Sequence, residues 1–294
     1  MFAEGHLKPD YQILGADTGR CTSKKTNIMG IPKQLRPMVK ARNGYGIVEC
    51  DYSQMEVGVL AALSGDHKLL EDYNSGDVYQ KFADKLAIER SEAKQLFLAV
   101  LYGVGKSTLV AWLNMEKTSV DNVLTQFSQS YKRAMAYLDE QAALGERMGY
   151  VSTTTGLRRR INRRAVRASS DQKPLLIWQR NWLRNFSIQA NAAVVFKKSL
   201  IDLAENIQFS EFKLLVPHYD AIVFEAPLPQ LSHYTDVVVA SMKRAMTDIF
   251  PSLKPHVKVS DSDPSCWNAG PDVQRYDEWI KTISNEVRKG VASV

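Results

Sequence analysis

Residues 46–63 of the chain read GIVECDYSQMEVGVLAAL, and they join a strand pattern to a helix pattern. Residues 46–51 form a short apolar run that ends in an acid, which predicts a buried strand. Ser53 and Glu56 have the spacing of a helix N-cap box, and apolar residues follow at helical spacing, so a helix is expected next. The stretch therefore predicts that Asp51 lies at the end of a buried strand, just before a helix.

Helical and strand patterns alternate through the rest of the chain. Residues 212–216 and 221–224 are two short strand patterns around residues 217–220, which predicts a tight hairpin with Asp220 at its tip. Further helices are expected at residues 90–103, 121–148, 174–206, 235–249 and 272–288. Because these helices are interleaved with a few antiparallel strands, the sequence predicts an α+β fold.

The composition is that of an ordinary globular protein. Of the 294 residues, 45% are hydrophobic and 24% are charged, which excludes a disordered, collagen-like or coiled-coil chain. The longest uncharged apolar stretches, residues 96–105 and 186–196, are shorter than the roughly 20 residues that a membrane span needs. The three cysteines lack metal-binding spacing, which favours a reduced protein without disulfides. We expect no membrane partner and an intracellular location.

The positive charge of the chain is concentrated in one segment. The formal net charge is +6, and six arginines fall within residues 158–167, a stretch that contains no acid: Arg158, Arg159, Arg160, Arg163, Arg164 and Arg167. Such a patch suits a polyanion such as the backbone of a nucleic acid. A solvated basic loop is the alternative, and the cluster alone does not separate the two.

Three separate elements carry side chains that suit one chemistry. Asp51 at a strand end and Asp220 on a hairpin can meet at one edge of a sheet, where two carboxylates and a backbone carbonyl would form an oxygen site for Mg²⁺. Four-residue spacing places a further set on one stripe of a helix: Arg90, Lys94, Leu98 and Tyr102. A facing helix with Arg and Lys would hold a triphosphate. Each element alone has an ordinary alternative, a turn acid or a solvated helix face.

Together, these elements resemble the three motifs of the family A DNA polymerases, the group of bacterial DNA polymerase I and several phage replicases. Residues 51–56, DYSQME, resemble motif A; residues 90–94, RSEAK, with Tyr102 and Gly103, resemble motif B; residues 218–225, HYDAIVFE, resemble motif C. Supporting segments occur in the family's order, so the resemblance covers about residues 13–267.

The resemblance implies a polymerase palm, a small antiparallel sheet with helices, into which a helical fingers subdomain is inserted. It places the first part of the palm at residues 1–66, the fingers at 67–155 with a motif B helix at 90–103, the second part of the palm at 156–270 and a tail at 271–294. Because few residues precede Thr18, we expect the thumb and exonuclease domains to be absent.

The implied reaction is template-directed addition of a deoxynucleotide to a primer 3′-hydroxyl. By resemblance, Asp51 and Asp220 bind two Mg²⁺ ions, for which Mn²⁺ can substitute, and the Tyr52 carbonyl completes the site. Lys94 and Arg90 contact the triphosphate, and Lys94 is also a candidate general acid toward the pyrophosphate. The implied partners are primer-template DNA and deoxynucleoside triphosphates.

The resemblance also assigns residues to the sugar, the base and the DNA. Tyr102 would stack at the template–primer end, and its alternative role is that of a core tyrosine. Glu56 would exclude a 2′-hydroxyl, in addition to its role in the helix N-cap. Gln54 belongs to the same motif as Glu56. The DNA-contacting set is Arg20, Asn185 and Gln189 in the minor groove, and Arg158, Arg159 and Arg160 on the backbone. Internal helix hydrogen bonds are the alternative for Asn185 and Gln189.

The chain departs from the family pattern at several positions. Ala221 stands where motif C usually has a second acid, Leu98 replaces an aromatic residue, Tyr79 a histidine and Asn181 an arginine. These changes and the missing thumb leave a second hypothesis open. In it, the chain is a polymerase-derived DNA-binding subunit or fragment, with little activity until a second chain or an upstream region supplies the thumb and exonuclease. A third hypothesis, a single-subunit RNA polymerase, is disfavoured by Glu56.

Overall fold

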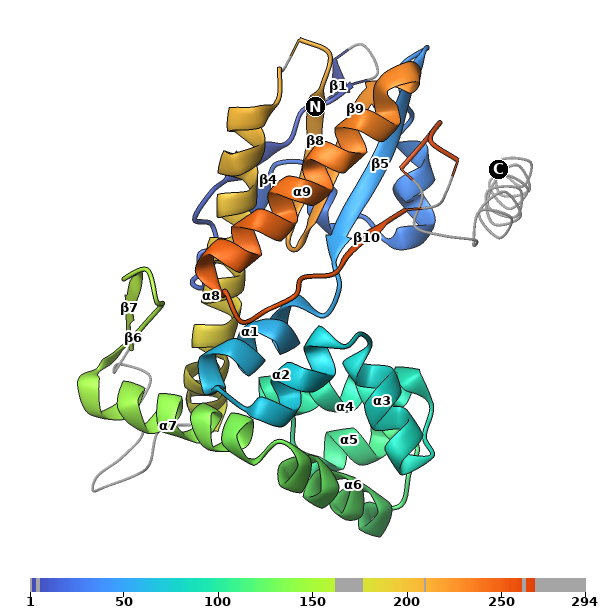
Figure 1. Ribbon diagram of the computed structural model, residues 1–294. Helices are drawn as coiled ribbons and strands as arrows, with labels where there is room; N and C mark the ends of the chain where they lie inside the picture. The colour runs from blue at the N-terminus through green and yellow to red at the C-terminus, as the bar shows by residue number, and fades with distance from the viewer. Residues whose placement is uncertain (1, 4–5, 162–176, 209, 261–262, 268–294) are drawn as a thin grey trace, which may run out of the picture.

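A computed structural model describes the chain except residues 1, 4–5, 162–176, 209, 261–262 and 268–294. Its largest sheet has the strand order β10–β5–β9–β8, and all neighbouring strands are antiparallel (Figure 1). The bounds of these strands are Tyr45–Tyr52 for β5, Lys213–His218 for β8, Ala221–Pro227 for β9 and Val257–Val259 for β10. This sheet and its helices confirm the α+β prediction.

The two faces of the sheet bury different sets of residues. Cys50, Ile222 and Phe224 face the main core, where helix α9 (Leu231–Ile249) packs against them with Val238 and Met242. Because side chains alternate along a strand, Glu49 and Asp51 point to the opposite face. On that face a smaller core contains Ile47, Val223 and Trp267 at some distance from the end of the strand.

The helical part of the molecule follows β5 directly. Its helices are α1 (Met55–Ser64), α2 (His67–Asn74), α3 (Val78–Leu86), α4 (Arg90–Tyr102), α5 (Lys106–Leu113), α6 (Lys117–Ser130) and α7 (Lys132–Met148). They lie together below the sheet in Figure 1, and the long helix α8 (Ile177–Asn206) runs along both parts. The expected inserted helical unit is therefore present.

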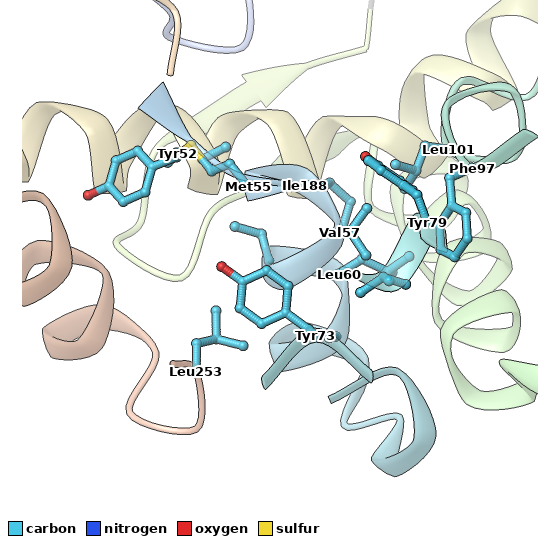
Figure 2. Packing of buried hydrophobic residues seen from close by; sticks show 14 of the residues in the cluster. Tyr52, Met55, Val57, Leu60, Tyr73, Tyr79, Phe97, Leu101, Ile188 and Leu253 are labelled. Carbon is cyan, nitrogen blue, oxygen red and sulfur yellow. The ribbon is translucent and has the colours of Figure 1, made fainter. Parts of the chain in front are cut away.

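One continuous core joins the sheet to these helices. Figure 2 shows Tyr52 from β5, Val57 and Leu60 from α1, Phe97 from α4 and Ile188 from α8 in this core. The Tyr52 phenol donates to the Met242 carbonyl of α9, and the Gly58 backbone lies so close to the Tyr73 ring that a Cβ would come within 2.6 Å of it. Tyr52 thus ties the end of β5 to α9, and α1 packs closely against α2.

The remaining elements are short. Three two-stranded sheets pair β1 (Phe2–Ala3) with β2 (His6–Leu7), β3 (Asp10–Gln12) with β4 (Thr22–Lys24), and β6 (Tyr150–Ser152) with β7 (Arg158–Arg160). Turns of 3-10 helix occupy Ile28–Gly30, Lys33–Met38 and Leu228–Gln230. The three cysteines are free and buried. Within the described ranges, no helix combines the length and the apolar character that crossing a bilayer requires.

Two predictions of secondary structure were wrong. The helix expected at 121–148 is two helices that meet at Tyr131, whose backbone leaves the helical conformation while its ring is buried among aromatic side chains. Asp66 stabilises the new helix start, because its carboxylate accepts the backbone N–H groups of Arg133 and Ala134, each at 3.0 Å. The Ser53–Glu56 cap box is also absent: α1 begins at Met55 after Gln54, which adopts a left-handed conformation. The helix expected at 272–288 lies outside the described residues.

Candidate active site

Asp51 and Asp220 lie at the same end of the central sheet. Asp51 pairs with Ala221 across β5 and β9, and the Tyr52 N–H donates to the Asp220 carbonyl oxygen at 3.1 Å. Asp220 follows Tyr219 in a two-residue turn between β8 and β9, and Tyr219 has φ +58°, the left-handed conformation that such tight hairpins require. The fold therefore brings together the two acids that the sequence singled out.

The two carboxylates are held where their negative charge is disfavoured. Burial, and then the charges of Asp220 and Glu49, raise the pKa of Asp51, while Lys94 and Lys33 act in the opposite direction. Burial also raises the pKa of Asp220. A nearby positive charge would therefore stabilise the ionised form of this carboxyl pair.

The acids fit a divalent cation by their chemistry. The Asp51 Oδ1 atom is buried and has no hydrogen-bond donor among the described residues. Oxygen ligands are those that Mg²⁺ prefers, and an unpartnered carboxylate oxygen is ready to serve as one. Within the described part of the chain, no group of three or more His, Cys, Asp or Glu side chains could hold a metal. A cation here would therefore rely on the two aspartates and on ligands from the backbone, the substrate and water.

Helix α4 presents its cationic stripe to solvent. Lys94 is exposed and lowers the pKa of Asp51, so its charge is felt at the carboxylates. Arg90 donates from Nε to Asp77 Oδ2 at 2.6 Å, and its guanidinium lies 5.6 Å from the centre of the Tyr79 ring. Arg90 is thus held by Asp77 at a neighbouring helix start, while Lys94 has no hydrogen bond or ion pair among the described residues.

Glu56 is the centre of a network at the other end of α4. The Tyr102 hydroxyl donates to Glu56 Oε2 at 3.0 Å, and the Arg20 guanidinium pairs with Glu56 Oε1. These long-range partners replace the local cap expected with Ser53. Gln54 does not reach this network, because its Oε1 accepts the Val78 N–H at 2.9 Å.

A pocket of about 270 Å³ lies beside Tyr102. Its walls come from three parts of the chain: Thr18, Tyr102, Asn181, Trp182, Asn185, Phe186 and Gln189. Asn185 is 5% exposed, and its Oδ1 atom lacks a donor in the described residues. The pocket therefore offers aromatic walls to a ligand, beside a buried Asn185 oxygen that lacks a donor in the described residues.

The described arginines of the basic segment form strand β7. Arg158 and Arg160 are exposed, and Arg159 donates to the Asp17 carbonyl oxygen at 2.9 Å. The Arg158 guanidinium lies 5.1 Å from the centre of the Tyr150 ring. Arg163, Arg164 and Arg167 lie outside the described residues. The part of the basic segment that is described is an exposed cationic hairpin.

The structure also explains some of the unusual positions. Tyr79 is buried, with its ring centre 5.3 Å from that of Phe97. Asn181 donates to the Gly103 carbonyl oxygen at 2.6 Å, and a Cβ on Gly103, which has φ +65°, would lie 2.4 Å from the Asn181 side chain. Asn181 therefore ties the end of α4 to α8, a contact that sequence reasoning missed.

Sequence reasoning also missed two charged residues near the carboxylates. Glu49 precedes Asp51 by two residues on the same strand face, and Lys33 acts on Asp51 from a 3-10 turn. The alternation of side chains along β5 could have indicated Glu49. No local pattern indicates Lys33, because it reaches the site only through the tertiary fold.

Comparison with known proteins gives a consistent result. The model of DNA polymerase family A matches residues 2–264. DNA polymerase I of Chloroflexus aurantiacus is 26% identical over 273 residues, which are 87% of this chain and 28% of that protein. The thermostable DNA polymerase I of Thermus thermophilus is 27% identical over 267 residues, 85% of this chain and 31% of that protein. The chain thus spans less than a third of the length of these relatives.

A solved structure shares the fold. It is the POL domain of Pol1 from M. smegmatis in a complex with a DNA primer-template and dNTP. The TM-score is 0.79 at 22% sequence identity, over 91% of this chain and 49% of that one.

Proposed function

Because the chain belongs to DNA polymerase family A, we propose that it is the catalytic core of a template-directed DNA polymerase. The observation that carries this proposal is the meeting of Asp51 and Asp220 at one sheet end, within the electrostatic reach of Lys94 on α4. The proposed substrates are deoxynucleoside triphosphates and a primer-template DNA, the ligands with which the related POL domain was solved.

The proposed organisation follows the sequence boundaries. We assign the palm to residues 1–66 and 156–270, the fingers to 67–155 and a tail to 271–294. The first boundary is supported by Asp66, whose carboxylate accepts the Leu69 N–H at the start of α2 and caps α7 as well. Asp66 therefore lies where the chain passes from α1 to α2, the first helix of the proposed fingers.

Asp51, Asp220 and the Tyr52 carbonyl would hold two Mg²⁺ ions, or Mn²⁺ in their place. When bound, such ions supply positive charge to the attacking oxygen and to the phosphate oxygens. The raised pKa values of the two aspartates support this role, because a bound cation would stabilise the carboxylate charges that burial and mutual repulsion disfavour.

The chain's own residues would orient the triphosphate and move one proton. Lys94 Nζ and the Arg90 guanidinium would donate hydrogen bonds to phosphate oxygens, which requires Arg90 to exchange Asp77 for the ligand. Lys94 Nζ would then give a proton to the pyrophosphate oxygen that leaves. Its exposed position on α4 supports this role.

Glu56 would select the sugar. Arg20 and Tyr102 hold its carboxylate in place, and its side chain is 13% exposed. A side chain that is fixed in this way is a rigid wall against a 2′-hydroxyl. Tyr102, which is 39% exposed at the end of α4, would offer its ring to the terminal base pair.

The DNA would lie along α8 and the cationic hairpin. Asn185 and Gln189 line the pocket beside Tyr102, and their amide N–H groups would donate to minor-groove acceptors together with the Arg20 guanidinium. Minor-groove contacts of this kind detect base-pair shape with little dependence on sequence. Arg158, Arg159 and Arg160 would contact the phosphate backbone.

Primer extension tests this proposal. A labelled primer is extended opposite each of the four template bases in turn, with each deoxynucleotide supplied alone and with Mg²⁺. We expect incorporation of the complementary nucleotide only, and none in EDTA. Ribonucleotides in place of deoxynucleotides separate the proposal from an RNA polymerase. Extension that ignores the template would refute the proposal.

A second candidate function is a polymerase-derived DNA-binding subunit that depends on a further chain or region for activity. Ala221 favours it, because the position opposite Asp51 in the register carries no acid. This alternative predicts tight binding of the primer-template without incorporation, and activity after a second chain is added.

A further inference from the structure

Glu49 is an acid near the candidate active site that the proposed mechanism does not use. It lies on β5 two residues before Asp51, and side chains two residues apart on a strand point to the same face. Asp51 pairs with Ala221 and Glu49 pairs with Val223 across β5 and β9. Glu49, Asp51 and Ala221 therefore share one face of the sheet.

The Glu49 side chain is fixed in position. Trp267 Nε1 donates to its Oε2 atom at 2.6 Å, and Arg36 Nη1 lies 3.5 Å from the same oxygen. Its backbone is held on both sides by Ser260, through a bond from the Glu49 N–H to the hydroxyl at 3.1 Å and one from the Ser260 N–H to the Glu49 carbonyl at 2.9 Å. The side chain is 15% exposed, and we find no hydrogen bond to its Oε1 atom within the described residues.

The charge of Glu49 acts on both candidate metal ligands. After burial and the charge of Asp220, Glu49 is a further cause of the raised pKa of Asp51. It also contributes to the raised pKa of Asp220, after burial and the charge of Glu56. The three carboxylates therefore lie in one electrostatic field, although Arg36 offsets part of the Glu49 charge.

The residue directly opposite Asp51 cannot supply such a charge. Ala221 is 1% exposed and ends in a methyl group. On this face, the acid nearest to Asp51 along β5 is Glu49, whereas its neighbour on β9, Ala221, has no acidic group.

We propose that Glu49 supplies a third negative charge to the divalent-cation site of Asp51 and Asp220. The inference rests on the proposed function and deepens it. Glu49 acts as a positioning residue through its charge, while Trp267 and Arg36 hold its Oε2 atom in place.

Mn²⁺ binding to the full chain, measured from the signal of free Mn²⁺ in electron paramagnetic resonance, tests this inference without any turnover. Gln in place of Glu49 keeps the shape and can still accept the Trp267 N–H, so it removes the charge alone. We expect Glu49→Gln to weaken Mn²⁺ binding roughly 10-fold, the size of effect known for groups that support metal ligands. Glu49→Asp, which keeps the charge, should retain most of the affinity.

Glu225→Gln is the matched control. Glu225 is also buried on this face and paired with an arginine, Arg42, but it lies four residues from Ala221 along β9, or about 13 Å. Its loss should leave Mn²⁺ affinity unchanged. Thermal unfolding of each variant separates loss of charge from loss of fold.

The outcomes distinguish the inference from the proposed function. If the unaltered protein binds no Mn²⁺ that depends on Asp51, as judged with Asp51→Asn, both are refuted. If that binding is present and Glu49→Gln matches the unaltered protein, Glu49 only anchors Trp267 and the inference alone is refuted. Equal weakening in Glu49→Gln and Glu49→Asp, or in Glu225→Gln, would likewise overturn it.

Discussion

Replacing Asp51 by asparagine removes a negative charge that the fold holds beside a second carboxylate. We therefore expect the metal-free protein to become more stable at alkaline pH, even though the variant loses its proposed function. Burial, the neighbouring Asp220 and Glu49 raise the pKa of Asp51 from its ordinary value of 3.8 to about 7. The folded state thus binds a proton more tightly than the unfolded chain does.

The magnitude follows from this difference. Each pKa unit corresponds to about 1.4 kcal/mol, so a shift of about three units would cost the ionised folded state about 4 kcal/mol. Asp51 is only partly buried, and solvent screening reduces the cost; we expect about 2 kcal/mol. For a chain of 294 residues, unfolding entropy of about 0.6 kcal/mol per kelvin converts this to a rise in Tm of about 3 °C.

The effect depends on pH in a defined direction. Because the folded pKa exceeds the unfolded one, the contribution of Asp51 to stability is greatest below pH 4 and is lost as the pH rises from there through 7. The gain from Asp51→Asn should accordingly be full at pH 8, smaller at pH 5 and absent below pH 4.

Thermal unfolding in EDTA at pH 8 and pH 5 measures this gain. Asp236→Asn, on the exposed face of α9, is the matched control and should leave Tm unchanged at both values. In excess Mg²⁺ the order should reverse, because only the unaltered protein gains from the cation. An unchanged or lower Tm for Asp51→Asn in EDTA at pH 8 would refute the electrostatic reasoning.

Three further predictions concern the fingers and the sugar. Lys94→Ala should slow single-turnover incorporation about 10²-fold to 10⁴-fold, because the leaving pyrophosphate would lose its proton donor. An unchanged rate would exclude Lys94 as the general acid. Glu56→Ala should raise ribonucleotide incorporation relative to deoxynucleotide about 10-fold or more, measured by competitive primer extension; unchanged selectivity would remove Glu56 from the sugar site. Phe97→Ala should lower Tm by about 5–8 °C, because the Phe97 ring lies 4.7 Å from that of Phe127 and its loss costs about 3–5 kcal/mol; a drop of under 1 °C would contradict the packing.

Local patterns were sufficient for the strand, the hairpin and the positions of the two acids. The apolar run of residues 46–51 and the short turn before Ala221 specify backbone geometry over a few residues, and antiparallel pairing then brings Asp51 and Asp220 to one sheet end. The four-residue stripe of α4 was predictable for the same reason.

Features that depend on distant partners were not predictable. Glu56 has the spacing of a cap box, but Arg20 and Tyr102, 36 and 46 positions away, hold its carboxylate instead. The break at Tyr131 arises because its ring joins the aromatic core and its hydroxyl donates to Asp72 at 3.1 Å. Arg20 and Tyr102 lie outside any short window around Glu56, and Asp72 lies outside any short window around Tyr131, so only the tertiary fold could reveal these partners.

Single-turnover incorporation by Asp51→Asn and Asp220→Asn tests most directly whether two strands of the sheet form one catalytic site. The assay follows addition of one deoxynucleotide to a primer in Mg²⁺, with Asp236→Asn as the control. We predict a loss of about 10³-fold or more in each aspartate variant, with primer-template binding retained and the control fully active. Full activity in either aspartate variant would contradict it.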